Sequence, residues 1–241
     1  LFLDDNQLMI LPLEISRLSN LKRLGLTNNH LLALPPEISR LSHLEELYLS
    51  NNRLTFLAPE IAKLANLKHL DLSGNLLKQL PSSLFCLPKL KTLVLGYSQL
   101  SHLPPEIAQL AKLRDLEISG NLLTTLPLEF SRLTSLKRLY ISNNHLFTFP
   151  PAILQLPKLR ELDFSANRLS SLPTEIARLS KTLEWLDLRD NDLMSLPWRE
   201  LSRLPELEWL DLLGNPLPIP EKILLRTDEP EEILKYYTRF N

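Results

Sequence analysis

The sequence predicts an α/β solenoid, a right-handed horseshoe with a parallel β-sheet on its concave face and short helical turns on its convex face. Three observations predict this fold. The string Leu-x-Leu-x-x-Asn-x-Leu occurs ten times with conservative replacements, it returns every 23 or 24 residues, and the rest of each period has a Pro- and Glu-containing pattern of its own. A fixed period of this size indicates stacked repeats, which bury their apolar sides only against their neighbours.

The first half of each period is expected to be a strand that ends in a turn. In the third unit Leu47 and Leu49 alternate with Tyr48, so the leucines share the buried face and the tyrosine points to the other face. The asparagine that follows can donate and accept hydrogen bonds, and it therefore satisfies main-chain groups where the chain leaves the sheet. This pattern is the signature of leucine-rich repeats. The asparagines are Asn6, Asn29, Asn52, Asn75, Asn121, Asn144, Asn167, Asn191 and Asn215, with Ser98 at the remaining position.

Serine has fewer hydrogen-bonding groups than asparagine, so we expect the row of stacked asparagines to be weakest at Ser98. Either the substitution is tolerated there or the solenoid has a hinge at that repeat.

The second half of each period is expected to form a helical turn on the convex side. It reads LPPEISRL at residues 34–41, and proline suits the first turn of a helix but cannot continue a strand ladder. Two periods are one residue longer, with the insertions within 180–182 and 198–200. Both insertions should lie outside the sheet.

The periodic part, residues 1–217, is followed by a different segment, residues 218–241, which we interpret as a helical C-terminal cap or junction. Asp228 and Glu231 fit the N-cap and N3 positions of a helix. The apolar residues that follow recur on one helical face and should cover the last repeat: Ile233, Tyr236, Tyr237 and Phe240. The chain starts inside a strand without a preceding cap, so we expect it to be part of a longer protein.

Composition excludes several classes of function. Lys and Arg number 27 and Asp and Glu 28, a net charge of −1, so bulk charge favours neither nucleic acid nor membrane as a partner. No apolar run reaches the ~18 residues of a transmembrane helix. The single cysteine, Cys86, cannot form a disulfide within the chain, and no glycosylation acceptor is present. We therefore expect a cytoplasmic protein, and no cofactor is indicated.

The repeats LPPEIxxLxxLxxLxLxxNxL resemble intracellular leucine-rich proteins, including Ras-signalling scaffolds and the repeat regions of bacterial Roco proteins. Residues 215–224 and 231–237 are similar to the junction between the repeats and the Roc GTPase domain of Roco proteins. The resemblance implies a non-catalytic regulatory module, with a homodimer allowed through domains outside this chain. The phosphate-binding motif GxxxxGK[ST] is absent from the sequence.

The candidate partner site lies on the last concave strands. Trp185 and Trp209 occupy equivalent positions in adjacent repeats, beside a row of aspartates and Arg189. Aligned carboxylates repel one another, and tryptophan is favoured at binding hot spots, so a basic or Arg-bearing segment of a protein partner would fit. Alternatively, this is a solvated face whose indoles pack against each other and the cap. The candidate residues are Tyr140, Asp163, Trp185, Asp187, Arg189, Trp209 and Asp211.

Three functions can be weighed against these features. The first is a protein-binding regulatory module of a Roco-type GTPase, whose partner is another protein or another domain of the same parent chain. The second is a stand-alone scaffold or bacterial effector. The third, an enzyme that uses the concave carboxylates, conflicts with an open sheet that excludes no water. Flat, rigid strands also cannot wrap a metal ion, so no metal site is expected.

Overall fold

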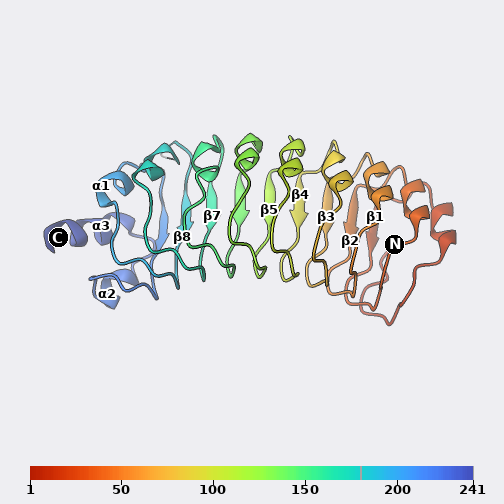
Figure 1. Ribbon diagram of the computed structural model, residues 1–241, viewed down its shortest axis with the longest axis horizontal. Coiled ribbons are helices and arrows are strands. Elements are labelled where there is room, and N and C mark those ends of the chain that lie inside the picture. Colours follow the sequence, from red (N-terminus) through yellow and green to blue (C-terminus); the bar gives the residue numbers. More distant parts are fainter. Residues whose placement is uncertain (180, 241) are drawn as a thin grey trace.

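The computed structural model describes residues 1–179 and 181–240, except for the side chains of residues 237–240. Nine strands form one parallel sheet in the order β1 to β9 (Figure 1). The strands are β1 Arg23–Gly25, β2 Glu46–Tyr48, β3 His69–Asp71, β4 Thr92–Val94, β5 Asp115–Glu117, β6 Arg138–Tyr140, β7 Glu161–Asp163, β8 Trp185–Asp187 and β9 Trp209–Asp211.

The register of the sheet follows the sequence period. Leu24 pairs with Leu47 and Leu47 with Leu70, and all three leucines are fully buried. The first of the ten predicted units differs, because Phe2 forms only an isolated bridge to Gly25 instead of a strand. That unit lies at the edge of the sheet and has a neighbour on one side only.

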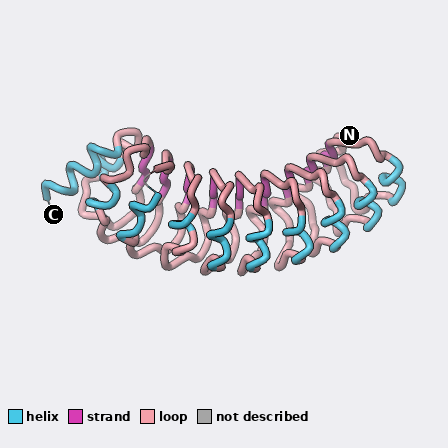
Figure 2. Tube along the Cα trace, turned by 90° about the horizontal axis from the view of Figure 1, so that it is seen from above, coloured by secondary structure: helices cyan, strands magenta, loops and turns pink. Residues whose placement is uncertain are grey.

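The convex side carries short helices, most of them 3₁₀ turns (Figure 2). In η2 the preceding Pro35 is extended, with φ −67°, and Ile38 points into the core with 2% of its surface exposed. Because helices are thicker than strands, stacking the two side by side bends the solenoid with the sheet inside the curve. The helices are η1 Leu13–Arg17, η2 Pro36–Arg40, η3 Pro59–Lys63, η4 Ser82–Cys86, η5 Pro105–Gln109, η6 Leu128–Arg132, η7 Ile153–Gln155, η8 Thr174–Leu179 and α1 Trp198–Leu201.

The two insertions leave the sheet intact. One lies within 180–182, where residue 180 is outside the described residues, and the other replaces the usual 3₁₀ turn by α1. The pairing of β7 with β8 and of β8 with β9 is continuous.

The asparagine row forms as predicted. The side-chain amide of Asn52 donates hydrogen bonds to the carbonyl oxygens of Leu26 (2.8 Å) and Leu49 (3.1 Å). Its Oδ1 accepts a hydrogen bond from the backbone N–H of Leu31 at 3.0 Å. Asn29 and the later asparagines of the row each link their own turn to the preceding repeat. Asn6 in the first unit is exposed, and its amide donates to carbonyl oxygens of its own turn.

The row is interrupted at Ser98, as predicted from its shorter side chain. The buried Ser98 Oγ has no hydrogen-bond partner among the described residues. The adjacent members of the row are complete: Asn121 Oδ1 accepts from Leu100 N–H at 3.0 Å, and Asn75 Oδ1 accepts from Leu54 N–H at 3.0 Å.

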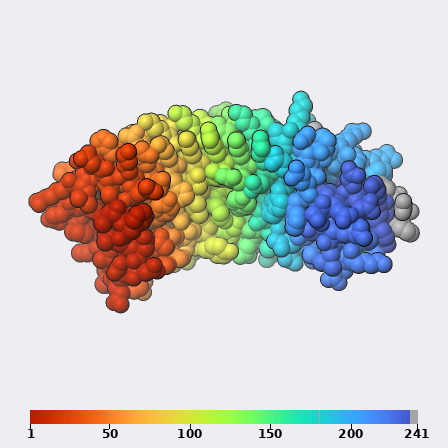
Figure 3. All heavy atoms as spheres, turned by 180° about the vertical axis from the view of Figure 1, so that it is seen from behind, coloured from red at the N-terminus to blue at the C-terminus, as the bar shows by residue number. Residues whose placement is uncertain are grey.

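The C-terminal segment covers the exposed edge of β9. The backbone N–H of Leu210 donates a hydrogen bond to the carbonyl oxygen of Thr227 at 2.8 Å, which continues the strand ladder beyond the last strand. Helices α2 Glu221–Leu224 and α3 Pro230–Phe240 pack at this end (Figure 3). Ile233 is fully buried and Leu234 is nearly so, whereas the side chains of residues 237–240 lie outside the described part.

The predicted N-cap of the last helix is wrong by one residue. Helix α3 begins at Pro230, so Glu229, not Asp228, precedes it. Proline takes the first helical position because it lacks the N–H that would be unsatisfied there. Among the described residues, no helix has the length and apolarity needed to cross a membrane.

Candidate partner-binding site on the concave face

Strands β8 and β9 place the two candidate tryptophans side by side. Trp185 pairs in register with Trp209, and Glu161 of β7 pairs with Trp185 on the other side. Both tryptophans are half-buried. They line a hollow of about 530 Å³ on the concave face, together with Tyr140, Glu161, Glu184, Glu208 and Asp228.

The hollow is acidic. Four of its lining residues carry carboxylates and none carries a cation. Glu184 forms an ion pair with Arg160 at 3.0 Å, and Glu161 accepts a hydrogen bond from the Tyr140 hydroxyl. The carboxylates of Glu208 and Asp228 have no ion-pair partner in the described part of the chain, and both residues are exposed. Their charge is therefore available to a bound cation.

The tyrosine at one wall of the hollow is held in its neutral form. Burial raises the pKa of Tyr140 well above its ordinary value, and the hydrogen bond to Glu161 raises it further. Tyr140 thus stays a hydrogen-bond donor at physiological pH, which fixes the position of the Glu161 carboxylate.

The three candidate aspartates do not line the hollow. Asp187 and Asp211 are buried, with 1% and 5% of their surface exposed, and Asp163 is half-buried. Each accepts a hydrogen bond from the backbone N–H two residues later and so helps to close the turn after its strand. The donors are Ser165 (2.9 Å), Arg189 (2.9 Å) and Leu213 (3.1 Å).

The expectation that these aspartates form an open, repelling row is therefore corrected. The Arg189 guanidinium pairs with Asp187 at 2.7 Å and lies 3.4 Å from an oxygen of Asp211, so the chain itself supplies a cation to two of the three aspartates. Burial raises the pKa of Asp187, while its hydrogen bonds from Arg189 oppose that shift. Arg189 remains half-exposed beside the tryptophans' strands.

The two indoles are neighbours but do not stack. No ring contact joins Trp185 to Trp209 among the described residues, whose aromatic pairs are Tyr48 with His69 and Phe149 with Phe164. The two indole rings therefore do not cover each other's faces.

Four residues of the hollow were missed in the sequence: Glu161, Glu184, Glu208 and Asp228. Glu161 is the first residue of β7 and pairs in register with Trp185. Glu184 and Glu208 precede their strands directly, at a repeat position that is basic in the five repeats before them. This change from basic to acidic residues at one repeat position could have identified both glutamates from the sequence. Asp228 gave no such signal, because the segment that carries it has no repeat to fix its place.

Aromatic faces beside unpaired carboxylates suit a cationic side chain, above all arginine, which combines cation–π contact with charge-assisted hydrogen bonds. Metal binding has a different requirement, a close group of oxygen, nitrogen or sulfur ligands. The described residues contain no group of three or more His, Cys, Asp or Glu side chains arranged to hold a metal ion.

Comparison with known proteins identifies the repeats. A family model described as leucine rich repeat matches residues 19–77, 42–100, 88–146 and 154–217. A comparison with curated proteins returned no match.

Among solved structures, the Leptospira interrogans LRR protein LIC12759 is 35% identical with a TM-score of 0.77, over 94% of this chain and 64% of that one. The plant peptide hormone receptor RGFR1, solved in complex with RGF2, is 33% identical with a TM-score of 0.76, over 90% of this chain and 36% of that one. A chain from the octameric complex of Latrophilin 3, Unc5D and FLRT2 (LRR) is 30% identical with a TM-score of 0.74, over 83% of this chain and 63% of that one.

The chain therefore spans less than two thirds of the length of each of these structures. The sheet, the asparagine row and the match over most of its repeats together show that the chain belongs to the leucine-rich repeat family.

Proposed function

We propose that this chain is a non-catalytic protein-binding module whose concave hollow holds a basic segment of a protein partner. The observation that carries the proposal is the hollow itself, in which two half-buried tryptophans and four carboxylates meet without a lining cation. An arginine or lysine placed there would neutralise Glu208 and Asp228 and lie against an indole face.

The solved relatives support binding of this general kind. RGFR1 is described in complex with RGF2, and the third structure is an assembly of several proteins. The two tryptophans of the hollow lie in the last two strands, so we propose that the partner contacts the C-terminal half of the concave face.

The proposal is tested by titrating the protein with a fluorescent Arg-rich peptide of about eight residues, long enough to cross several strands at ~3.3 Å per residue. Trp185→Ala and Trp209→Ala are each expected to weaken binding about tenfold, the loss typical of an aromatic hot spot. Tyr48→Ala is the matched control, because Tyr48 is also a half-buried aromatic residue on the concave sheet but lies far from the hollow. An equal loss of peptide affinity in all three variants, or no loss in any of them, would refute the site.

We further propose that the module regulates a Roco-type GTPase inside the cell, and that the basic segment belongs to a separate protein or to another domain of the same parent chain. Support comes from the junction-like sequence at residues 215–237. The coding sequence downstream of residue 241 decides this point. A GxxxxGK[ST] motif in a following domain supports a GTPase, whereas a stop codon favours the stand-alone scaffold or effector.

Residues 218–241 are proposed to act as the cap of the repeats and as the junction to the GTPase domain of the parent chain. The hydrogen bond from Leu210 N–H to Thr227 and the burial of Ile233 and Leu234 support the capping role.

A further inference from the structure

A row of cations runs along one edge of the sheet and ends beside the acidic hollow, where Arg160 pairs with Glu184. The residue directly before each strand from β3 to β7 is basic, and we call these five residues the basic row: Lys68, Lys91, Arg114, Lys137 and Arg160. The equivalent residues before β8 and β9 are Glu184 and Glu208, and the one before β2 is Glu45. The row is thus bounded by carboxylates at both ends.

Backbone hydrogen bonds fix the spacing of the row. Lys91 N–H donates to the Lys68 carbonyl at 2.8 Å, and the same bond joins each later member to the one before it, at 2.7–2.8 Å. Neighbouring members are therefore one strand spacing apart, ~4.8 Å, and the five span roughly 19 Å.

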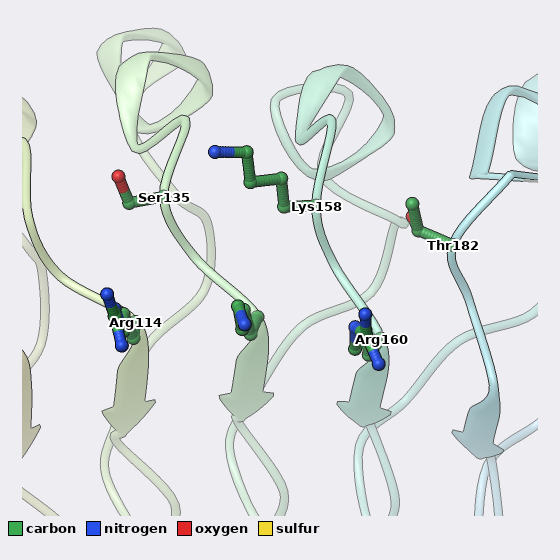
Figure 4. Close-up of a pocket in the computed structure, with 6 residues that line it drawn as sticks. Arg114, Ser135, Lys158, Arg160 and Thr182 are labelled. Carbon is green, nitrogen blue, oxygen red and sulfur yellow. The ribbon is translucent and has the colours of Figure 1, made fainter.

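The row borders a hollow that a chain segment could enter. Its volume is about 350 Å³, and it is lined by Arg114, Lys137 and Arg160 of the row and by Ser135, Lys158 and Thr182. Figure 4 shows Arg114 and Arg160 at the starts of their strands, with Ser135, Lys158 and Thr182 nearer the helical turns. The hollow thus combines four cations with two hydroxyl groups.

The middle of the row is not neutralised by the chain. Lys68 pairs with Glu45 at 2.6 Å and Arg160 with Glu184 at 3.0 Å, at the two ends. Among the described residues, no ion pair involves Lys91, Arg114 or Lys137. Like charges in neighbouring strands repel, so a bound anion would stabilise this edge.

We propose that the basic row is a second docking site and that it binds a short acidic peptide segment of a protein partner. An extended peptide of about six residues at ~3.3 Å each has the length of the row, and its carboxylates would meet the unpaired cations. The bounding Glu45, Glu184 and Glu208 limit the anion to that length.

Nucleic acid fits this surface less well than a peptide. Single strands are held by stacking their bases on aromatic side chains, and neither the row nor its hollow contains one. A long polyanion would also run onto the bounding carboxylates, and the net charge of −1 gives it no general attraction.

The test uses a fluorescent peptide of about six alternating Asp and Glu residues, which matches the length of the row, and the whole 241-residue chain. Reversing three row charges in one variant (Lys91→Glu, Arg114→Glu, Lys137→Glu) is expected to weaken binding at least about tenfold. The matched control reverses three exposed convex cations (Arg40→Glu, Lys63→Glu, Arg132→Glu), which changes the net charge equally and should alter affinity less than about twofold. Circular dichroism checks that both variants fold, and Arg114→Gln alone should give an intermediate loss.

Three results would overturn the proposal. The first is the absence of peptide binding to the unmodified chain. The second is an equal loss in the row and control variants, which would show attraction by bulk charge only. The third is tighter binding of an oligothymidine of matched charge, which would assign the row to nucleic acid. None of the varied residues lines the acidic hollow, so failure here leaves the Trp185 and Trp209 site standing.

Discussion

The central repeats, β3 to β7, and the last two, β8 and β9, have the same interior and opposite surfaces. Leu70 in the centre and Leu210 near the end are both fully buried at the same repeat position. On the outside, the residue before each strand changes from a cation to glutamate, and the first strand residue becomes tryptophan. Stacking thus constrains only the side chains that face the core, so the surface columns can differ from one part of the solenoid to the next.

The largest effect on stability is expected from ending the chain at residue 217. This truncation should unfold the last two repeats and leave the central ones folded. The truncation removes the buried Ile219, Leu224, Ile233 and Leu234, worth at most about 6–12 kcal/mol at ~1.5–3 kcal/mol each. Hydrogen exchange followed residue by residue should show loss of protection in β9 and normal protection in β4 to β6. Uniform loss along the chain would contradict this local role of the cap.

Substitutions in the asparagine row are expected to change the free energy of unfolding less than the truncation does, and in opposite directions at Asn121 and Ser98. Asn121→Ser removes four hydrogen bonds of the buried amide, at about 0.5–1.5 kcal/mol each, so the free energy of unfolding should fall by about 2–6 kcal/mol. Ser98→Asn should raise it, because the new amide would complete the interrupted row. Urea denaturation measures both changes. If the two substitutions shift stability in the same direction, the interpretation of Ser98 as the weak position is wrong.

The smallest effect concerns a carboxylate in the central concave sheet. Burial raises the pKa of Glu117 above its ordinary value, with the Ser119 hydrogen bonds opposing the shift. The folded chain therefore holds this proton to higher pH than the unfolded chain, and stability falls as pH rises from about 4.3 through the folded pKa. Glu117→Gln should raise the melting temperature at pH 7 and leave it nearly unchanged at pH 4. An equal rise at both pH values would exclude titration of Glu117 as the cause.

The sequence predicted the features that depend on the period. Strand register, the buried leucines, the asparagine row and its interruption at Ser98 all follow from the rule that equivalent residues stack. The side-by-side placement of Trp185 and Trp209 followed from the same rule. The sequence alone was therefore enough to assign which residues stack on the concave face.

The remaining features depend on side-chain conformation or on the part of the chain without a repeat. Arg189 turns back onto Asp187 and Asp211, and the choice between this pairing and an open row is made by rotamers, which the period does not determine. Asp228 reaches the hollow only because Thr227 pairs with β9, a contact formed by the aperiodic C-terminal segment.

The most direct test of the account is a crossed titration with the basic and acidic peptides. We expect the double variant Trp185→Ala with Trp209→Ala to bind the basic peptide at least about tenfold more weakly and to bind the acidic peptide with an affinity changed less than about twofold. Reversal of Lys91, Arg114 and Lys137 should give the opposite pattern. If both sets of substitutions weaken the binding of both peptides equally, the acidic hollow and the basic row are not separate binding surfaces.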